Sequence, residues 1–334
     1  MSMITLYSPC EWQVFQRATP AKGPARIEGR AAGADTVEVR FTGKSLEGRL
    51  DSKWRKARLD KLTGGFSLMA QLPAGGWYTC EARAKRKGKT VGTCEVETFG
   101  VGEVFVTAGQ SNSTSCGQFP TKQKSGMVSA FNGREWKKAT DPVWGAHDMK
   151  GIDENQLSIF AGGSPWLAFG DAMHKSTGVP IGVVVTGQGG SSVREWTRHG
   201  TIFPWMMYRI AQLGYKGFRA VLWHQGESDV EMAPWEYGNA LTQVIENSRH
   251  DAGWAIPWFV AKVSYHSPEN PSFETIRAEF DNVVRDGTAL AGPDTDTLTG
   301  DNRDEDGKGI HFSVKGLTAH GRMWAKIVLD WLGE

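Results

Sequence analysis

The stretch Val104-Phe105-Val106-Thr107-Ala108-Gly109-Gln110-Ser111-Asn112 decides the fold of this chain. Its first five residues are apolar or β-branched and predict a buried strand. Gly109 ends the strand and permits a sharp turn that carries small polar residues. A serine on such a turn projects into the crevice at the carboxyl edge of a parallel sheet. Ser111 is therefore the candidate nucleophile, although a turn serine with a purely structural role gives the same local pattern.

The composition is that of an ordinary globular chain. It has 334 residues, of which 40% are hydrophobic and 22% charged, enough for two cores of unequal size. Lys and Arg number 38 against 37 Asp and Glu, so no charge excess indicates nucleic acid or an anionic membrane as a partner. No apolar run is long enough for a transmembrane helix. We read no signal peptide in residues 1–17, and a periplasmic or secreted bacterial location stays open if a leader was removed.

The cysteines and tryptophans are informative about packing. Four cysteines are too few for a disulfide framework, and their spacing fits no zinc site. Cys80 and Cys94 stand equally far from Lys87, so a three-residue hairpin loop would place them opposite each other. Two alternatives stay open for this pair, namely an inward-facing disulfide or two buried thiols. The 14 tryptophans suit stacking on sugar rings, but they also suit core packing.

The periodicity changes near residue 100 and divides the chain into two domains. Residues 1–100 contain short alternating segments, such as 36–42 and 65–72, between glycine-rich turns. This spacing predicts a small all-β sandwich of immunoglobulin or fibronectin type. Residues 101–334 alternate apolar strands with helices, which predicts an α/β domain with a doubly wound parallel sheet and helices on both sides. We expect a short linker between the two domains.

The elements of the α/β domain follow from apolar runs, proline positions and helical periodicity. Prolines at positions 165, 204 and 234 suit the first turn of a helix. Strands are expected at 104–108, 181–186, 218–223, 258–263 and 289–291. Helices are expected at 165–174, 204–213, 234–250 and 273–284, and from 313 onward.

The first three of these strands end in polar or glycine-rich residues. Ser111 follows the first, Gly189 and Gly190 follow the second, and Gln225 follows the third. Because the carboxyl ends of parallel strands share one edge, we expect these residues to converge. His311 lies on the loop just before the last helix, and this loop is able to reach the same edge.

These residue types suit acyl transfer to a serine. A hydroxyl with its ordinary pKa is a poor nucleophile, and a histidine within hydrogen-bond reach can remove its proton during attack. The tetrahedral intermediate needs donors aimed at its oxyanion, each worth on the order of 3 kcal/mol. We expect these donors to be the backbone amides of Ser111 and Gly189 and the side-chain amide of Gln225.

Four blocks of the sequence resemble the SGNH hydrolase superfamily, in its sialate O-acetylesterase-like carbohydrate esterase branch. They are Gly109-Gln110-Ser111-Asn112, Gly189-Gly190-Ser191, the run Trp-His-Gln-Gly-Glu-Ser-Asp at 223–229, and His311-Phe312-Ser313. The resemblance spans residues 101–334, with the blocks in the right order. It implies a three-layer α/β/α hydrolase that removes O-acetyl groups from carbohydrates without a metal or organic cofactor. Many members also carry an N-terminal β-sandwich.

The sequence departs from this family at the acid that orients the histidine. The family commonly has an aspartate three residues before the catalytic histidine, where this chain has Lys308. Asp306 stands five residues before His311, and Asp304 and Glu305 are nearby. Either Asp306 reaches His311 from a longer loop, or a Ser-His dyad works with a backbone carbonyl or another carboxylate. We take Asp306 as the expected third catalytic residue.

Further polar residues are candidates for contact with the substrate or for support of the catalytic groups. They are Gln110, Asn112, His224, Glu227 and Arg194. Glu227 and Asp229 lack the setting of a glycosidase acid pair, so we favour loop-organising hydrogen bonds for them. Arg194 is a candidate for holding an acidic sugar, with a solvated surface arginine as the alternative. His320 is expected to pack on a face of the last helix.

The sequence therefore predicts a serine esterase that deacetylates a carbohydrate through an acyl-enzyme on Ser111. A lipase, thioesterase or peptidase of the same superfamily is the enzymatic alternative. A non-catalytic carbohydrate-binding protein is the alternative from another class, and the intact set of serine, glycine, glutamine and histidine argues against it. The particular sugar, the acetyl position and the oligomeric state do not follow from the sequence.

Overall fold

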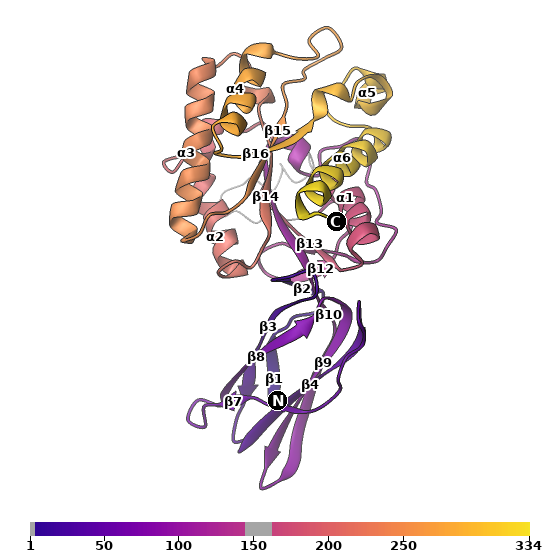
Figure 1. Ribbon diagram of the computed structural model, residues 1–334, viewed down its shortest axis with the longest axis vertical. Coiled ribbons are helices and arrows are strands. Elements are labelled where there is room, and N and C mark those ends of the chain that lie inside the picture. Colours follow the sequence, from indigo (N-terminus) through magenta and orange to yellow (C-terminus); the bar gives the residue numbers. More distant parts are fainter. Residues whose placement is uncertain (1–3, 144–161) are drawn as a thin grey trace.

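One strand joins the two halves of the molecule in the computed structural model, which describes residues 4–143 and 162–334 (Figure 1). Strand β10 covers Lys89–Gly109. Its first part pairs with β9 (Gly75–Arg86), and its last part lies between β13 (Ile181–Val185) and β14 (Ala220–His224). The boundary expected near residue 100 therefore falls inside a continuous strand rather than in a linker.

Residues 4 to about 100 form two sheets that share one hydrophobic core. One sheet has the order β1-β3-β8-β7, with β1 at Ile4–Ser8, β3 at Lys22–Ala31, β8 at Gly65–Pro73 and β7 at Arg58–Leu59. The other contains β9, the first part of β10, β2 (Gln13–Gln16), β4 (Thr36–Ser45), β5 (Gly48–Arg49) and β6 (Arg55–Lys56). Buried residues alternate with exposed or half-buried ones along β3 and the first part of β4, as period-two side-chain directions require. The immunoglobulin or fibronectin type of this half stays a prediction.

The hairpin of β9 and β10 has a shorter loop than expected, and two cysteines are aligned differently as a result. Its loop contains two residues, Lys87 and Gly88, rather than three. A bulge between Thr90 and Gly92 then shifts the register of β10 against β9. As a result, Cys94 pairs with Ala82, and Cys80 pairs with Val96. The prediction that Cys80 and Cys94 lie opposite each other is wrong, and both are free thiols here.

The sheet of the second half has the order β12-β11-β13-β10-β14-β15-β16. All its described pairings are parallel except that of β12 with β11. The additional strands are β11 (Val128–Phe131), β12 (Trp136–Lys138), β15 (Trp258–Lys262) and β16 (Leu290–Asp294). The predicted strands are confirmed, but β11 and β12 were not predicted because both are short and lie in a segment without clear periodicity.

Helices cover both faces of this sheet and complete three layers (Figure 1). Helices α1 (Trp166–Thr177) and α6 (Val314–Leu332) pack against each other on one face. Helices α2 (Phe203–Leu213), α3 (Pro234–Ala252) and α4 (Glu274–Arg285) cover the other. The expected helices are confirmed, with ends that differ by a few residues. Among the described residues, no helix is both long and apolar enough to cross a membrane.

Gly109 has a steric reason to be glycine at the end of β10. Its φ angle is 127°, a region that side chains other than glycine's rarely adopt. A Cβ atom at this position would lie 2.0 Å from the carbonyl oxygen of His224, its partner in β14. The chain can therefore turn toward Ser111 while β10 and β14 stay paired.

Candidate active site

Three polar strand ends meet at the carboxyl edge of the sheet, as expected from the sequence. The central strand β10 is parallel to both neighbours, and Gly109 is opposite His224. Beyond the strands, the amide of Gln188 donates to the carbonyl of Gly109 (2.8 Å). The amide of Gln110 donates to the carbonyl of His224 (3.0 Å). The turn that carries Ser111 is thereby held between the loops that follow β13 and β14.

Ser111 begins a short 3₁₀ turn, η1 (Ser111–Ser113), and is nearly buried, with 8% of its surface exposed. The carbonyl of Ser111 accepts hydrogen bonds from the amide (3.0 Å) and the hydroxyl (2.7 Å) of Thr114. Its own hydroxyl has no hydrogen-bond partner among the described residues. The backbone is therefore anchored while the Oγ atom stays available, which suits a nucleophile before substrate binds.

His311 is accompanied by Asp304 rather than by the expected Asp306. The Nδ1 atom of His311 lies 3.7 Å from Oδ2 of Asp304, and the amide of Asp304 donates to the carbonyl of His311 (3.0 Å). Asp306 is exposed and adopts a left-handed conformation in the short helix α5 (Asp304–Gly307). The loop doubles back because the amides of Lys308 and Gly309 both donate to the carbonyl of Asp304.

The surroundings of His311 favour its neutral form. Burial lowers the pKa of the imidazole, and the positive charge of Arg303 lowers it further, while the carboxylate of Asp304 raises it. The net direction is downward, so the ring is neutral at neutral pH. A neutral imidazole is the form that can accept a proton from a serine hydroxyl.

The loops of Ser111 and His311 are joined through one backbone carbonyl. Asn112 donates from Nδ2 to the carbonyl oxygen of Ile310 at 3.2 Å. Arg303 donates from Nη1 to the same oxygen at 2.8 Å. Two side chains therefore fix the residue that precedes His311, and one of them directly follows Ser111.

Arg303 is itself held rigidly and is only 3% exposed. Its Nε and Nη2 atoms donate to the carbonyl oxygens of Leu298 (2.6 Å) and Thr295 (3.1 Å). Its guanidinium lies between two rings, 3.7 Å from the centroid of Tyr265 and 4.3 Å from that of Phe312. Burial lowers its pKa to about 10, so Arg303 stays charged at neutral pH.

The side-chain amide of Gln225 is occupied by protein acceptors. Its Nε2 atom lies 2.6 Å from Oδ2 of Asp229, 3.0 Å from the carbonyl of Ser191 and 3.3 Å from Oε1 of Gln110. An amide nitrogen has two protons, so none is left for a substrate oxygen in this arrangement. The Asp229 carboxylate also determines which end of the amide is nitrogen. The prediction of Gln225 as an oxyanion donor is therefore not supported, and its contacts instead secure the loop after β13.

Asp229 continues this support of the loop after β13. Its carboxylate accepts from the hydroxyl of Ser192 (2.6 Å) and from the amide of Val193 (2.7 Å). Gln110 supports the loop after β14, because its Oε1 atom accepts a hydrogen bond from the amide of Ser228 (3.0 Å). The loop-organising role expected for Asp229 is confirmed.

Glu227 is a buried carboxyl group beside the nucleophile turn. Its Oε1 atom accepts from Nδ2 of Asn112 (3.0 Å), and burial raises its pKa to about 7. The Nδ1 atom of His224 lies 3.7 Å from Oε1 of Glu227, a distance typical of an ion pair. Burial lowers the pKa of His224 to about 3, however, so that the ring is neutral and the contact is not a pair of opposite charges. Glu227 therefore helps to orient Asn112.

Arg194 and His320 occupy different settings. Arg194 is largely exposed, and its guanidinium pairs with Glu236. Its suggested contact with an acidic sugar stays a prediction. His320 is fully buried on α6 and accepts from Nε1 of Trp324 (3.0 Å), so its expected packing role is confirmed.

Sequence reasoning missed Arg303 and His266 as parts of this site. Arg303 stands in the charged run 301–308, where an arginine resembles a solvated surface residue. His266 follows β15 and donates from Nε2 to the carbonyl of Glu227 (2.6 Å). Its position after a fourth parallel strand was the one available signal, since that strand ends at the same edge.

Comparison with known protein families places this chain among the carbohydrate esterases. Residues 101–330 match the family model described as carbohydrate esterase, sialic acid-specific acetylesterase. The chain therefore belongs to this carbohydrate esterase family.

Individual proteins resemble this chain in sequence or in fold. A probable carbohydrate esterase from Arabidopsis thaliana is 30% identical over 166 residues, which cover 45% of this chain and 64% of that protein, slightly less than two thirds of its length. A carbohydrate acetylesterase from Xanthomonas citri has a similar fold, with a TM-score of 0.63 and 19% identity, over 99% of this chain and 76% of that one. A solved protein from Arabidopsis thaliana has a TM-score of 0.53 and 22% identity, over 68% of this chain and 98% of that one. At these identities the structural likeness shows the fold alone.

Proposed function

We propose that this protein is a serine esterase that removes O-acetyl groups from a carbohydrate. The observation that carries the proposal is the pairing of His311 with Asp304 on a loop that Asn112 ties to the turn of Ser111. Membership of a carbohydrate esterase family supports the same class of reaction. The reaction as proposed requires no metal or organic cofactor.

In the first half of the reaction, the Oγ atom of Ser111 attacks the acetyl carbonyl carbon. His311 accepts the serine proton, and Asp304 orients the ring and stabilises its charged form. The backbone amides of Ser111 and Gly189 donate to the oxyanion of the tetrahedral intermediate. The intermediate then collapses: the bond to the sugar oxygen breaks, and His311 returns the proton to that oxygen.

In the second half, a water molecule attacks the acetyl group on Ser111. His311 takes a proton from this water, and the acyl bond to Oγ breaks when the new intermediate collapses. The proton passes from His311 to Oγ, which restores the hydroxyl and releases acetate. Gln225 is assigned to holding the loop that contains Gly189 rather than to the oxyanion.

The decisive experiment compares wild type with Ser111→Ala on an aryl acetate. We expect the variant to lose activity by at least about 10³-fold, and a serine-directed phosphonate to add mass to the wild type but not to the variant. The fold of the variant is checked by circular dichroism. Wild-type rates in the folded variant would show that Ser111 is not the nucleophile.

Two other functions are tested by simple comparisons. A sugar deacetylase should lose activity steeply from acetyl to butyryl esters, whereas a lipase or thioesterase of the same superfamily should not. A non-catalytic carbohydrate-binding protein would bind glycans without reacting with the phosphonate. Acetate release from acetylated sialic acids, xylo-oligosaccharides and bacterial polysaccharides would then identify the substrate.

A further inference from the structure

A pocket lies at the edge of the sheet opposite the candidate active site. It has a volume of about 770 Å³. Phe218 and Arg219 line it just before β14 begins, and Pro257 lines it just before β15 begins. The pocket is therefore at the amino ends of strands whose carboxyl ends carry the polar residues described above. One strand of five residues separates the two edges by about 17 Å.

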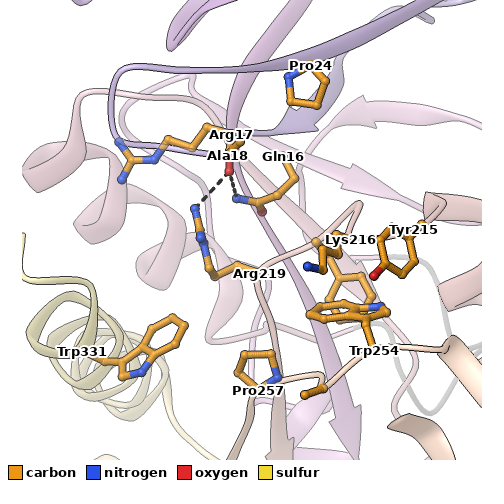
Figure 2. A pocket seen from close by; sticks show the side chains of 12 residues that line it. Gln16, Arg17, Ala18, Pro24, Tyr215, Lys216, Arg219, Trp254, Pro257 and Trp331 are labelled. Atoms are coloured by element: carbon orange, nitrogen blue, oxygen red, sulfur yellow. Dashed lines mark hydrogen bonds between the residues drawn. The ribbon is translucent and has the colours of Figure 1, made fainter. Parts of the chain in front are cut away.

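Aromatic side chains form two sides of this pocket. Figure 2 shows Trp331 on one side, Trp254 and Tyr215 on the other, and Pro257 below them. Tyr215 is 70% exposed and Trp331 is 40% exposed, in contrast to the many tryptophans that are buried in the core. Exposed rings that face a shared pocket are suited to stacking against the apolar faces of sugar rings.

The charged groups of the pocket are all positive. Its lining contains Arg17, Lys216 and Arg219 and no acidic residue. The two arginines are already engaged: Nε of Arg17 (2.6 Å) and Nε of Arg219 (2.7 Å) contact the fully buried carboxylate of Glu103. Nη2 of Arg17 also contacts the carboxylate of Glu334 at 2.6 Å. These ion pairs hold the side chains of Arg17 and Arg219, both labelled in Figure 2, and leave the arginine charges largely compensated.

Lys216 is the exception among these cations. It forms no ion pair with any acid in residues 4–143 or 162–334, and its Nζ atom lies 5.4 Å from the ring centroid of Tyr215. An ammonium group beside an exposed ring can pair with a carboxylate while the ring contacts the sugar that bears it. This exposed ammonium group is therefore free to pair with an anionic ligand.

We propose that this pocket is an accessory binding site for an acidic carbohydrate chain, whose rings contact Tyr215, Trp254 and Trp331 and whose carboxylate pairs with Lys216. The inference rests on the proposed function, because it assigns the esterase a polymeric substrate that carries uronate or sialate groups. Binding at the amino edge of the sheet leaves the carboxyl edge free for the reaction. It would hold a polymer near the active site between successive deacetylations.

The test is affinity electrophoresis in native gels that contain polygalacturonate or polysialic acid, neither of them acetylated. We expect the wild type and Ser111→Ala to be retarded equally, and added salt to weaken the retardation. Tyr215→Ala and Lys216→Gln should weaken binding by at least about fivefold. Tyr208→Ala is the matched control, because Tyr208 is a comparably exposed tyrosine that does not line the pocket.

Three outcomes would overturn the proposal. They are no retardation of the wild type by either acidic polymer, unchanged retardation of both pocket variants, and equal retardation by polyglutamate, which carries the charge without the sugar. Failure of the proposed function is visible separately, as absent hydrolysis of an aryl acetate. The pocket variants should retain full activity on that small substrate, since none of their replaced residues belongs to the catalytic machinery.

Discussion

Asn112 donates a hydrogen bond of 3.2 Å to the carbonyl oxygen of Ile310, although 198 positions separate the two residues. Asn112 directly follows Ser111, and Ile310 directly precedes His311. The contact therefore couples the position of the candidate nucleophile to that of the candidate base. Arg303, which precedes Ile310 by 7 positions, donates to the same carbonyl.

The pH dependence of hydrolysis should report the lowered pKa of His311. The ring acts as a base only when neutral, so kcat/KM rises as pH rises through its pKa. Because burial lowers this pKa from the ordinary value of 6.5, half-maximal kcat/KM should occur below pH 6.5. A pH-rate profile on an aryl acetate measures this midpoint, and a midpoint above 6.5 would contradict the assignment.

Asp304 and Asp306 form a matched pair of variants. Asp304→Asn should lower kcat by about 10²–10⁴-fold because the ring loses its orienting carboxylate. The acidic limb of the profile should also move to lower pH, since the charge of Asp304 raises the pKa of His311. Asp306→Asn should stay within about twofold of wild type. Full activity in Asp304→Asn would instead favour a Ser-His dyad.

Arg303 should affect both the geometry and the pKa of His311. Arg303→Lys retains the charge but cannot reach all three carbonyl oxygens, so kcat should fall while the acidic limb stays in place. Arg303→Gln also removes the charge that lowers the pKa of His311, so its limb should move to higher pH. Equal profiles for the two variants would show that Arg303 acts through packing alone.

Glu227 should make the protein less stable at neutral and alkaline pH than at acidic pH. Its pKa is about 7 in the folded protein against an ordinary 4.5, so the folded state binds more protons and loses stability as pH rises between these values. Glu227→Gln removes this loss and still accepts from Asn112. Its gain in unfolding free energy over wild type should be larger at pH 8 than at pH 5, by an amount on the order of a few kcal/mol. Urea denaturation at the two pH values measures this, with the exposed Glu246→Gln as control.

Gly109 should tolerate no side chain. A Cβ atom there would lie 2.0 Å from a backbone oxygen of β14, which no rotation of a side chain can relieve. Gly109→Ala should therefore cost more than about 4 kcal/mol or prevent folding. Gly253 also has a positive φ of 73°, but its Cβ would meet open space, so Gly253→Ala should cost about 1 kcal/mol. Similar urea midpoints for the two variants would contradict this account.

Most of the α/β architecture was predictable from local pattern. Apolar runs predicted β13, β14 and β15, and prolines near the helix starts predicted α1, α2 and α3, because these signals depend on residues close in sequence. The edge strands β11 and β12 were not predicted, since three or four residues carry little periodic signal. The alignment of Cys80 with Cys94 was wrong because a hairpin register depends on loop length and bulges, which the sequence does not state.

The sequence by itself determined the parallel sheet, the strand that ends at Ser111 and the block around Gln225, because period and residue type express them locally. Only the tertiary structure decided how those groups are used. It brought Asp304 rather than Asp306 to His311, turned the amide of Gln225 toward Asp229, and placed Arg303 between two rings beneath the loop. Such choices depend on how a loop doubles back and on which buried polar atoms find partners, and both are properties of contacts between residues far apart in the chain.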